Sequence, residues 1–334
     1  MLPHFNIPHL PFRQLEMTFT AGAECQLPKQ KGALLRGVFG KALYTLFCQK
    51  PAGTLCEACT LNRMCPYTRI FHTLMFEPAP RFMRGINTTP RPYTIYCKNE
   101  QTHFKKGEPL SLVCTLIGND AVDLLEFIVA AAELMGRTGF GKRRTPFELL
   151  AIHQIAQGGK QHLIYRPPAK ALHARPEPES LHVFSNEVVS DFSISTLAFQ
   201  SPLRLKTGKK LVREFNFRAL IFRMIRRINE LSWFHGAEKE VQDEFYDLLC
   251  YADKIQVSDI QLKWEGRRRY SGRQKQNYET SGFIGSVRLA GDLRPFWPIM
   301  KCCEILHLGK GAVLGNGKIK LGPPITKNRE KIHA

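Results

Sequence analysis

The stretch from Glu304 to Leu321, EILHLGKGAVLGNGKIKL, combines residue types that suit the binding of phosphate groups. The glycines of its loop are Gly309, Gly311, Gly315 and Gly317, and Lys310 and Lys318 lie among them. Glycines leave backbone N–H groups accessible, so such a loop can lie flat against a chain of phosphates. Lysines add positive charge without requiring a base sequence. Glycines also serve ordinary tight turns, so the rest of the chain must decide between the two interpretations.

A second stretch, EGRRRYSGRQKQNYETS from Glu265 to Ser281, mixes cations with aromatic rings between two predicted strands. The candidate contacts in it are Arg267, Arg268, Arg269, Tyr270, Arg273 and Lys275. Arginines bind phosphates, and tyrosines stack on unpaired bases of RNA. A solvated hairpin is the alternative, but five cations within nine residues favour RNA binding.

Four cysteines lie close together in CQKPAGTLCEACTLNRMC, from Cys48 to Cys65. Cys56 and Cys59 are separated by two residues, a spacing that offers two thiolates to one tetrahedral metal. Cys48 and Cys65 can complete four ligands, with His72 in reserve. The pattern favours a structural Zn²⁺ over free thiols or an iron–sulfur cluster. A metal with four protein ligands has no open position, so we expect no catalytic role for it.

The charge balance indicates a polyanionic partner. Lysine and arginine outnumber aspartate and glutamate by 48 to 29 over 334 residues, which gives a net charge of +19. Such a charge favours nucleic acid first and an anionic membrane surface second. No signal peptide is visible in MLPHFNIPHLPF, and the apolar run Leu124–Met135 is too short to span a membrane. We therefore expect a soluble, cytoplasmic protein without a membrane partner.

The order of predicted elements repeats along the chain. Apolar periodicity predicts, in the first half, strand Arg13–Thr20, helix Lys31–Phe47, strands Pro90–Cys97 and Leu110–Ile117, helix Asp120–Met135 and strand Pro146–Ile155. In the second half it predicts strand Ser193–Leu205, helices Leu211–Phe234 and Glu238–Tyr251, strands Ile255–Trp264 and Gly282–Ala290, helix Trp297–Leu306 and strand Lys318–Leu321. Each half has the order of a ferredoxin-like unit.

The predicted fold is therefore α+β, with tandem ferredoxin-like (RRM-like) βαββαβ domains, a C-terminal glycine-rich loop and a small Cys-rich insertion. The N-terminal domain is predicted at residues 1–156, with the insertion at 48–72. Residues 157–182 are predicted as a linker because they are rich in proline and glycine. The C-terminal domain is predicted at residues 183–334, and it contains the basic hairpin and the glycine-rich loop.

Several segments resemble the RAMP superfamily of CRISPR-associated proteins, and more closely its precursor-crRNA-processing endoribonucleases. The matching segments are LLRGVFGKAL at Leu34–Leu43, CPYTRIF at Cys65–Phe71, RRRYSGRQ at Arg267–Gln274 and HLGKGAVLGNGKIKL at His307–Leu321. The resemblance implies an enzyme that binds the repeat of a CRISPR transcript, with other CRISPR effector subunits as further candidate partners. It further implies one cut per repeat without a catalytic metal. The 2′-hydroxyl would attack the adjacent phosphorus and leave a 2′,3′-cyclic phosphate.

The acid and base for that reaction are sought among a few side chains. Histidine suits proton transfer near neutral pH. Many relatives carry a catalytic histidine in or near the first helix, where this chain offers Lys41 and Tyr44 instead. His307 is a candidate because it precedes the glycine-rich loop, and His235 is a candidate at a helix end. A histidine at a helix C-terminus can also serve the helix dipole, which is the structural alternative for His307.

Two other functions compete with the enzyme. One is a non-catalytic RAMP subunit that binds crRNA in an effector complex, with the same fold, charge and glycine-rich loop. The other is a zinc-dependent DNA-binding protein. That one needs a recognition helix beside the cysteines, but the residues after Cys65, PYTRIFHTLMF, are mostly apolar. The basic hairpin and the internal repeat favour the processing enzyme.

Overall fold

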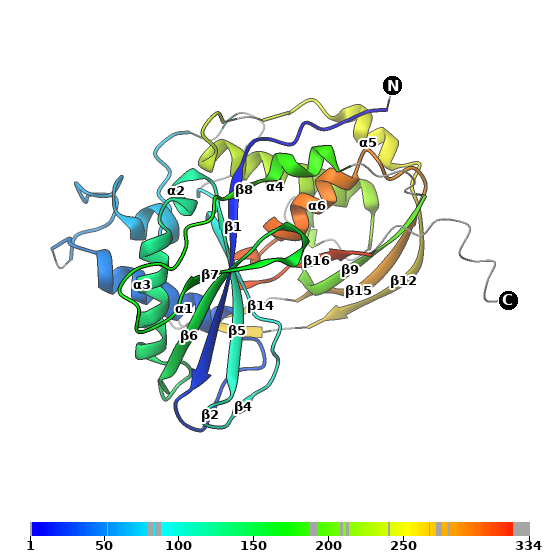
Figure 1. The fold of residues 1–334 in the computed structure, drawn as a ribbon. Coiled ribbons are helices and arrows are strands. Elements are labelled where there is room, and N and C mark those ends of the chain that lie inside the picture. The colour runs from blue at the N-terminus through cyan, green and yellow to red at the C-terminus, as the bar shows by residue number, and fades with distance from the viewer. Residues whose placement is uncertain are drawn as a thin grey trace. The chain divides into compact units, whose positions relative to one another are not determined.

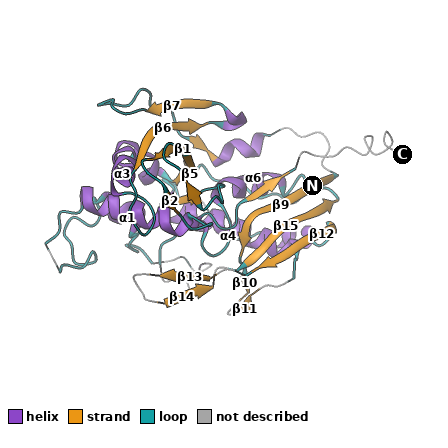
Figure 2. Ribbon diagram, turned by 90° about the horizontal axis from the view of Figure 1, so that it is seen from below, coloured by secondary structure: helices purple, strands orange, loops and turns teal. Residues whose placement is uncertain are grey.

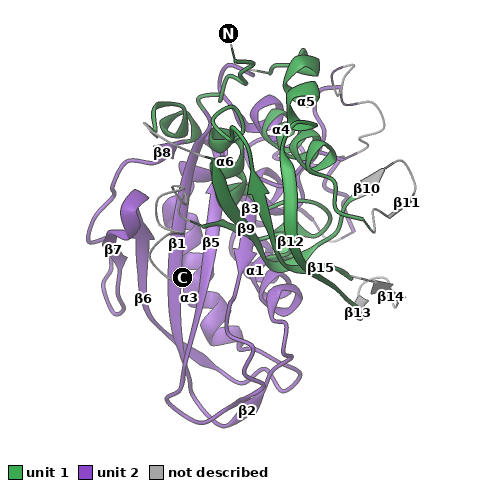
Figure 3. Cartoon of the chain, turned by 90° about the vertical axis from the view of Figure 1, so that its right-hand side faces the viewer, with its two compact units in different colours: residues 1–9, 181–230, 240–334 green, residues 10–180, 231–239 purple. Residues whose placement is uncertain are grey.

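The structure is a computed structural model (Figure 1). It describes residues 2–51, 53–78, 80, 83, 88–187, 193–207, 210–211, 214–239, 241–266, 268–271, 276–279 and 281–322. The chain divides into two compact units (Figure 3). Unit 1 comprises residues 1–9, 181–230 and 240–334, and unit 2 comprises residues 10–180 and 231–239. Among the described helices, none is long and apolar enough to cross a membrane.

Unit 2 is built on an antiparallel sheet in the order β3-β5-β1-β6-β7. Its strands are β1 (Pro11–Ala21), β3 (Tyr93–Tyr96), β5 (Pro109–Ile117), β6 (Phe147–Ile155) and β7 (Gln161–Tyr165). The short β8 (Glu179–Ser180) pairs with β1, and β2 (Cys25–Gln26) pairs with β4 (His103–Phe104). Alternate residues of β1, such as Leu15 and Phe19, are fully buried, as the pattern of a half-buried strand requires.

The helices of unit 2 pack where glycines permit close contact. They are α1 (Gly32–Phe47), the π-helix Tyr67–Phe71, α2 (Asn119–Val122) and α3 (Leu125–Thr138), and η3 (Gln157–Gly159) is a 3₁₀ turn. A Cβ on Gly40 of α1 would lie 2.0 Å from the Phe71 ring. A Cβ on Gly136 of α3 would lie 2.3 Å from Phe147 O of β6. At Gly136 the neighbour is backbone, so only glycine fits there, whereas a larger residue at Gly40 would have to displace the Phe71 ring.

Unit 1 has a smaller antiparallel sheet in the order β12-β15-β9-β16, of which Figure 2 labels β12, β15 and β9. Its strands are β9 (Ile194–Leu203), β12 (Gln256–Glu265), β15 (Gly282–Ala290) and β16 (Ile319–Leu321). Two hairpins stand outside it, β10 (Lys206–Thr207) with β11 (Lys210–Leu211) and β13 (Arg268–Ser271) with β14 (Gln276–Glu279). The helices are α4 (Phe217–His235), whose residues from Leu231 onward belong to unit 2, α5 (Tyr246–Ala252) and α6 (Trp297–Leu306). The 3₁₀ turns are η4 (Leu181–Asn186) and η5 (Ala312–Leu314).

The predicted α+β class is confirmed, and the main sheet of each unit is antiparallel. Each unit has the element order strand, helix, strand, strand, helix, strand. In the sheet of each unit, the first of these four strands lies between the third and the fourth. Residues 157–182, the predicted linker, include β7 and β8, which pair in the unit 2 sheet.

Two predicted helices are longer than the observed ones. The helix predicted from Leu211 begins at Phe217, because Asn216 Oδ1 caps it by accepting from Ala219 N at 2.8 Å. The helix predicted from Glu238 begins only at Tyr246. Residues 241–245 before it have no regular secondary structure, and the buried Asn229 Nδ2 donates to Gln242 O there at 2.6 Å.

Candidate functional site

The glycine-rich loop of unit 1 is tied to the end of β9 by backbone hydrogen bonds. Gly317 N donates to Pro202 O at 3.0 Å, and Lys310 N donates to Arg204 O at 3.1 Å. Ser201 Oγ donates to the loop carbonyl of Gly315 at 2.7 Å and accepts from Lys318 N at 2.8 Å. The loop therefore has one defined conformation set by the strand beneath it.

All four predicted glycines of this loop have positive φ: +71° at Gly309, +86° at Gly311, +79° at Gly315 and +66° at Gly317. A Cβ on Gly309 would lie 2.5 Å from Arg204 O, and one on Gly317 would lie 1.9 Å from Leu308 O. Packing alone therefore requires glycine at two of these positions.

The tip of the loop faces outward. Gly309 and Lys310 are exposed. Within the described chain, the N–H groups of Gly309 and Gly311 donate to no backbone carbonyl. The tip thus combines accessible backbone donors with a lysine, which is what a phosphate group needs from a loop.

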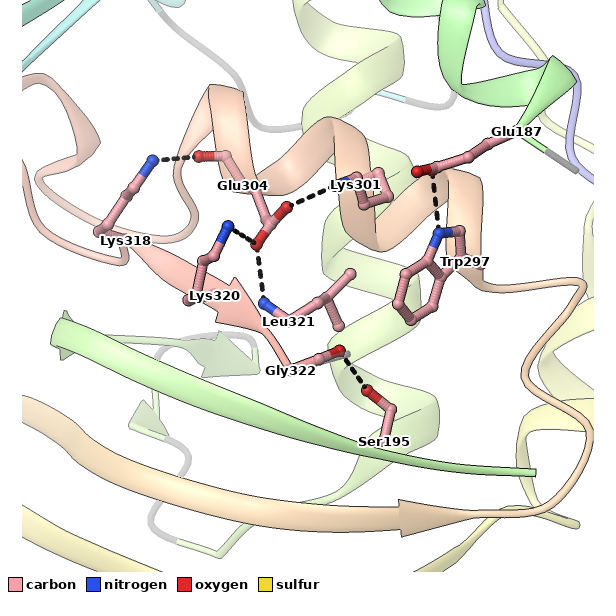
Figure 4. A network of polar contacts seen from close by, with 9 residues as sticks. All are labelled: Glu187, Ser195, Trp297, Lys301, Glu304, Lys318, Lys320, Leu321 and Gly322. Carbon is pink, nitrogen blue, oxygen red and sulfur yellow. Dashed lines mark hydrogen bonds and ion pairs between the residues drawn. The ribbon is translucent and has the colours of Figure 1, made fainter. Parts of the chain in front are cut away.

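Glu304 anchors the far end of the loop (Figure 4). Its Oε1 accepts from Leu321 N at 2.7 Å, and its carboxylate lies 3.2 Å from Lys301 Nζ and 3.6 Å from Lys320 Nζ. Its backbone oxygen accepts from Lys318 Nζ at 2.6 Å. Ser195 Oγ also donates to Gly322 O at 3.2 Å, so side chains fix both ends of β16. Sequence reasoning missed Glu304 and Ser201. For Glu304, the sequence did offer an indication, because an acidic residue within the apolar run of α6 is unusual.

Lys318 points inward, although it was predicted to bind RNA. Burial lowers the pKa of its ammonium to about 8, with Lys320 adding to the decrease and Glu304 opposing it. The lysine that remains exposed on the loop is Lys310.

His307 lies inside unit 1, and only 1% of its surface is exposed. Burial lowers the pKa of its imidazole well below the usual range, and the charges of Lys318 and Arg227 lower it further. Its φ of +54° turns the chain from α6 into the loop. The ring is thus neutral and enclosed.

The basic hairpin is present as β13 and β14, with Arg268 opposite Glu279 and Tyr270 opposite Asn277. Only the backbone of these strands is described. The remaining predicted contacts, Arg267, Arg273 and Lys275, lie outside the described residues.

In unit 2, α1 exposes a stripe at intervals of four and three residues, formed by Gly37, Lys41 and Tyr44. Tyr44 is 45% exposed, and its ring meets that of Tyr67 edge to face, with 5.3 Å between centroids. A Cβ on Gly37 would meet nothing within 4 Å. The two predicted groups of this helix therefore lie side by side on an accessible surface.

His235 also belongs to unit 2. Its Nε2 lies 2.6 Å from Pro90 O, and 9% of its surface is exposed. A Cβ on Gly118 would come within 2.4 Å of the His235 Cβ, so the histidine packs directly on that glycine. This arrangement supports a packing role.

The four predicted metal ligands, Cys48, Cys56, Cys59 and Cys65, line one cavity of about 210 Å³. Among the described residues, no group of three or more His, Cys, Asp or Glu side chains is already arranged to hold a metal ion. All ten cysteines have free thiols.

Unit 2 carries a second glycine-rich loop, between α3 and β6, which was not predicted as a site. Its tip exposes three consecutive cations, Lys142, Arg143 and Arg144. A run of basic residues beside glycines was visible in the sequence.

Two family models match successive parts of the chain. Residues 10–177 match a model described as an N-terminal domain, and residues 197–319 match the model of the CRISPR-associated endoribonuclease Cas6. A search of curated proteins finds no match.

Solved structures with the same fold include a Cas6 product complex, at 14% identity and a TM-score of 0.56 over 93% of this chain and 99% of that chain. Thermus thermophilus Cas6 is similar at 12% identity and a TM-score of 0.54, over 94% of this chain and 99% of that one. A partial Cas6-RT-Cas1–Cas2 complex matches at 12% identity and a TM-score of 0.56, over 96% of this chain and 46% of the longer chain.

Proposed function

Because the chain belongs to the Cas6 family of CRISPR-associated RAMP endoribonucleases, we propose that it cuts the repeat of precursor CRISPR RNA without a catalytic metal. The observation that carries this proposal is the Cas6 match over residues 197–319, which includes the glycine-rich loop. The net charge of +19 agrees with an RNA substrate.

The proposed reaction is an in-line transesterification. The 2′-hydroxyl beside the scissile phosphate loses its proton to water and attacks the phosphorus, while the bond to the 5′-oxygen breaks and that oxygen takes up a proton from a general acid. The upstream product ends in a 2′,3′-cyclic phosphate. The N–H groups of Gly309 and Gly311 and the ammonium of Lys310 would hold phosphate oxygens, and the hairpin β13–β14 would bind the RNA beyond them.

For the chemical step we favour Tyr44 and Lys41 over the two histidines. The hydroxyl of Tyr44 can donate a proton to the departing 5′-oxygen, and the ammonium of Lys41 can stabilise the charge that builds on the phosphate. Both side chains are exposed on α1, whereas His307 and His235 are buried. In this assignment His307 and His235 have structural roles and take no part in the reaction.

We further infer that the two units are copies of one ferredoxin-like βαββαβ motif. The strand order β3-β5-β1-β6 in unit 2 corresponds to β12-β15-β9-β16 in unit 1. An internal duplication explains why both units carry a glycine-rich loop at the same place in the order.

A cleavage assay tests the function. Labelled repeat RNA is incubated with the protein in EDTA, beside RNA in which the scissile 2′-hydroxyl is replaced by hydrogen. We expect one cut in the first RNA and none in the second. A cut that requires Mg²⁺, or tight binding with no cut of any cognate repeat, would overturn the proposal. The second outcome would instead support a subunit that only holds crRNA.

Variants then test the roles. Tyr44→Phe removes only the hydroxyl, and we expect the single-turnover cleavage rate to fall about 100-fold or more with unchanged RNA affinity. Thr45→Val is the matched control on the next exposed position of α1. Equal rates for Tyr44→Phe and wild type would remove Tyr44 from the chemistry while leaving the function in place.

A further inference from the structure

In the segment that joins α1 to the π-helix Tyr67–Phe71, the described residues from Cys48 to Cys65 form turns but no helix or strand. Single hydrogen bonds close its turns: Cys59 N donates to Cys56 O at 3.2 Å, and Cys65 N donates to Leu61 O at 2.9 Å. Such isolated bonds contribute little net stability each. The segment needs another source of order.

That source is not a hydrophobic core. The large apolar side chains of the segment are exposed: Leu55 by 69%, Leu61 by 51% and Met64 by 78%. Small structures that bury little apolar surface are usually stabilised by disulfides or a metal ion. The composition of the segment leaves its cysteines as the groups that could supply such a crosslink.

Those cysteines already face a common space. All four line the same cavity, and Cys56 is 6% exposed. The Lys50 Nζ donates to Cys56 Sγ at 3.5 Å and to Thr54 O at 2.6 Å, so a cation stands beside the thiols. The turn from Cys56 to Cys59 sets two thiols at the spacing of a zinc knuckle.

We propose that Cys48, Cys56, Cys59 and Cys65 together bind one structural Zn²⁺ that folds this segment. On binding, each thiol releases its proton to solvent and donates its sulfur to the metal, which gives a tetrahedral site with a net charge of −2. The ammonium of Lys50 offsets part of that charge. The cavity closes as the thiolates move from its walls onto the metal.

The metal would act on the structure next to it. Cys65 O accepts from Thr68 N at 3.1 Å and from Arg69 N at 3.0 Å, so the last ligand is joined to the start of the π-helix. That helix carries Tyr67, whose ring packs against Tyr44. A zinc site at the cysteines therefore fixes the surface beside α1 without taking part in any reaction.

Metal content is the first test, on the purified full-length chain. We expect about one zinc per chain, and about none in a Cys56→Ser, Cys59→Ser double variant. Cys25→Ser is the matched control, since Cys25 is a partly exposed thiol of the same unit outside the segment, and it should keep the zinc. Co²⁺ in place of Zn²⁺ should give the visible absorption of a tetrahedral thiolate site. Metal that stays bound in the double variant would overturn the proposal.

A second test needs no variant and is independent of cleavage. Wild-type protein is alkylated with and without a zinc chelator, and the modified cysteines are identified by mass spectrometry. We expect the four cysteines of the segment to be at least about tenfold slower to react with zinc present, because a coordinated thiolate is shielded. Cys25 should react at one rate in both conditions. Equal rates for the four cysteines, or disulfides among them, would overturn the proposal.

Discussion

The two glycine-rich loops of the molecule share a place in their units but differ in where they put charge. In unit 2, Gly139 has φ +80°, and a Cβ there would lie 2.3 Å from Arg144 O. Phe140 and Thr145 close the loop with two backbone hydrogen bonds of 2.8 and 3.1 Å. The three cations at its tip are exposed.

The loop of unit 1 uses glycine in the same way, at Gly309 and Gly317, but keeps one cation inside. Its Lys318 donates to Glu304 O, and the tip offers backbone N–H groups and Lys310. Glycine in both loops is thus explained by packing. Phosphate binding has to be argued from what each tip exposes, which is side-chain charge in unit 2 and mostly backbone donors in unit 1.

The largest expected effect comes from the glycine that packing requires most. In Gly317→Ala the new Cβ would lie 1.9 Å from Leu308 O at a φ of +66°. We expect the free energy of unfolding to fall by about 3 kcal/mol or more and cleavage to be lost. Gly53→Ala is the control, since φ is +81° there but a Cβ meets nothing within 4 Å. It should cost only about 1 kcal/mol in urea denaturation. Equal costs would mean that the loop relaxes freely.

The largely enclosed Lys318 gives the next effect, and the sign of that effect follows from protonation. Lys318 has a pKa of about 8 in the folded chain and near 10.5 when exposed. Between these pH values the unfolded chain binds one more proton, so stability rises with pH. We expect a gain of about 2 to 3 kcal/mol from pH 8 to 10.5 that Lys318→Met abolishes. The exposed Lys320→Met should keep most of the gain, because burial is the larger cause of the lowered pKa of Lys318. Parallel curves for all three proteins would contradict the inward position of Lys318.

The exposed cations of the unit 2 loop should act on RNA affinity alone. Lys142→Ala with Arg143→Ala removes two charges, and we expect about tenfold weaker repeat binding and a salt slope reduced by about 2. Unfolding should be unchanged, because both side chains are exposed. Lys105→Ala with Lys106→Ala removes equal charge from another exposed turn of the same unit. If both pairs weaken binding equally, net charge and not this loop explains the loss.

The smallest effect concerns His307. Since burial holds the pKa of its imidazole well below the usual range, only the unfolded chain takes up this proton as the pH falls below about 6.5. Stability should therefore decline in acid, by at most about 1.4 kcal/mol per pH unit from this group. His307→Gln should flatten that decline, whereas the exposed His103→Gln should leave it as in wild type. An unchanged acid slope in His307→Gln would place the ring in solvent.

Much of the fold follows from local pattern. The alternation of Leu15, Met17 and Phe19 predicts β1, and glycines with lysines predict a loop that the structure shows as an ordered turn system. The sequence pattern does not show whether a side chain points toward solvent or toward the interior. Lys310 and Lys318 belong to one loop, yet one is exposed and the other is largely enclosed, because Glu304 fixes the second from a neighbouring helix.

Contacts between residues that are distant in sequence also explain where the helices end and why His307 is buried. Neighbours in sequence suggest that His307 stands at the mouth of the loop, but its positive φ turns it into the core. The segment before α5 is bound at Gln242 O by Asn229, a residue outside that helix. Contacts of this kind join residues that are distant in sequence, so periodicity cannot reveal them.

Because α4 contributes residues to both units, unit 2 cannot be completed until late in the synthesis of the chain. Unit 2 ends its continuous part at Ser180 but takes residues 231–239 from much later in the chain. Until these emerge, the nascent unit lacks His235, which covers Gly118 and meets the Pro90 carbonyl. At bacterial to eukaryotic translation speeds this wait lasts about 3 to 12 seconds. A ribosome-bound chain stopped after residue 180 would therefore present an unfinished surface for chaperones to bind, and a messenger truncated there would yield no complete first half.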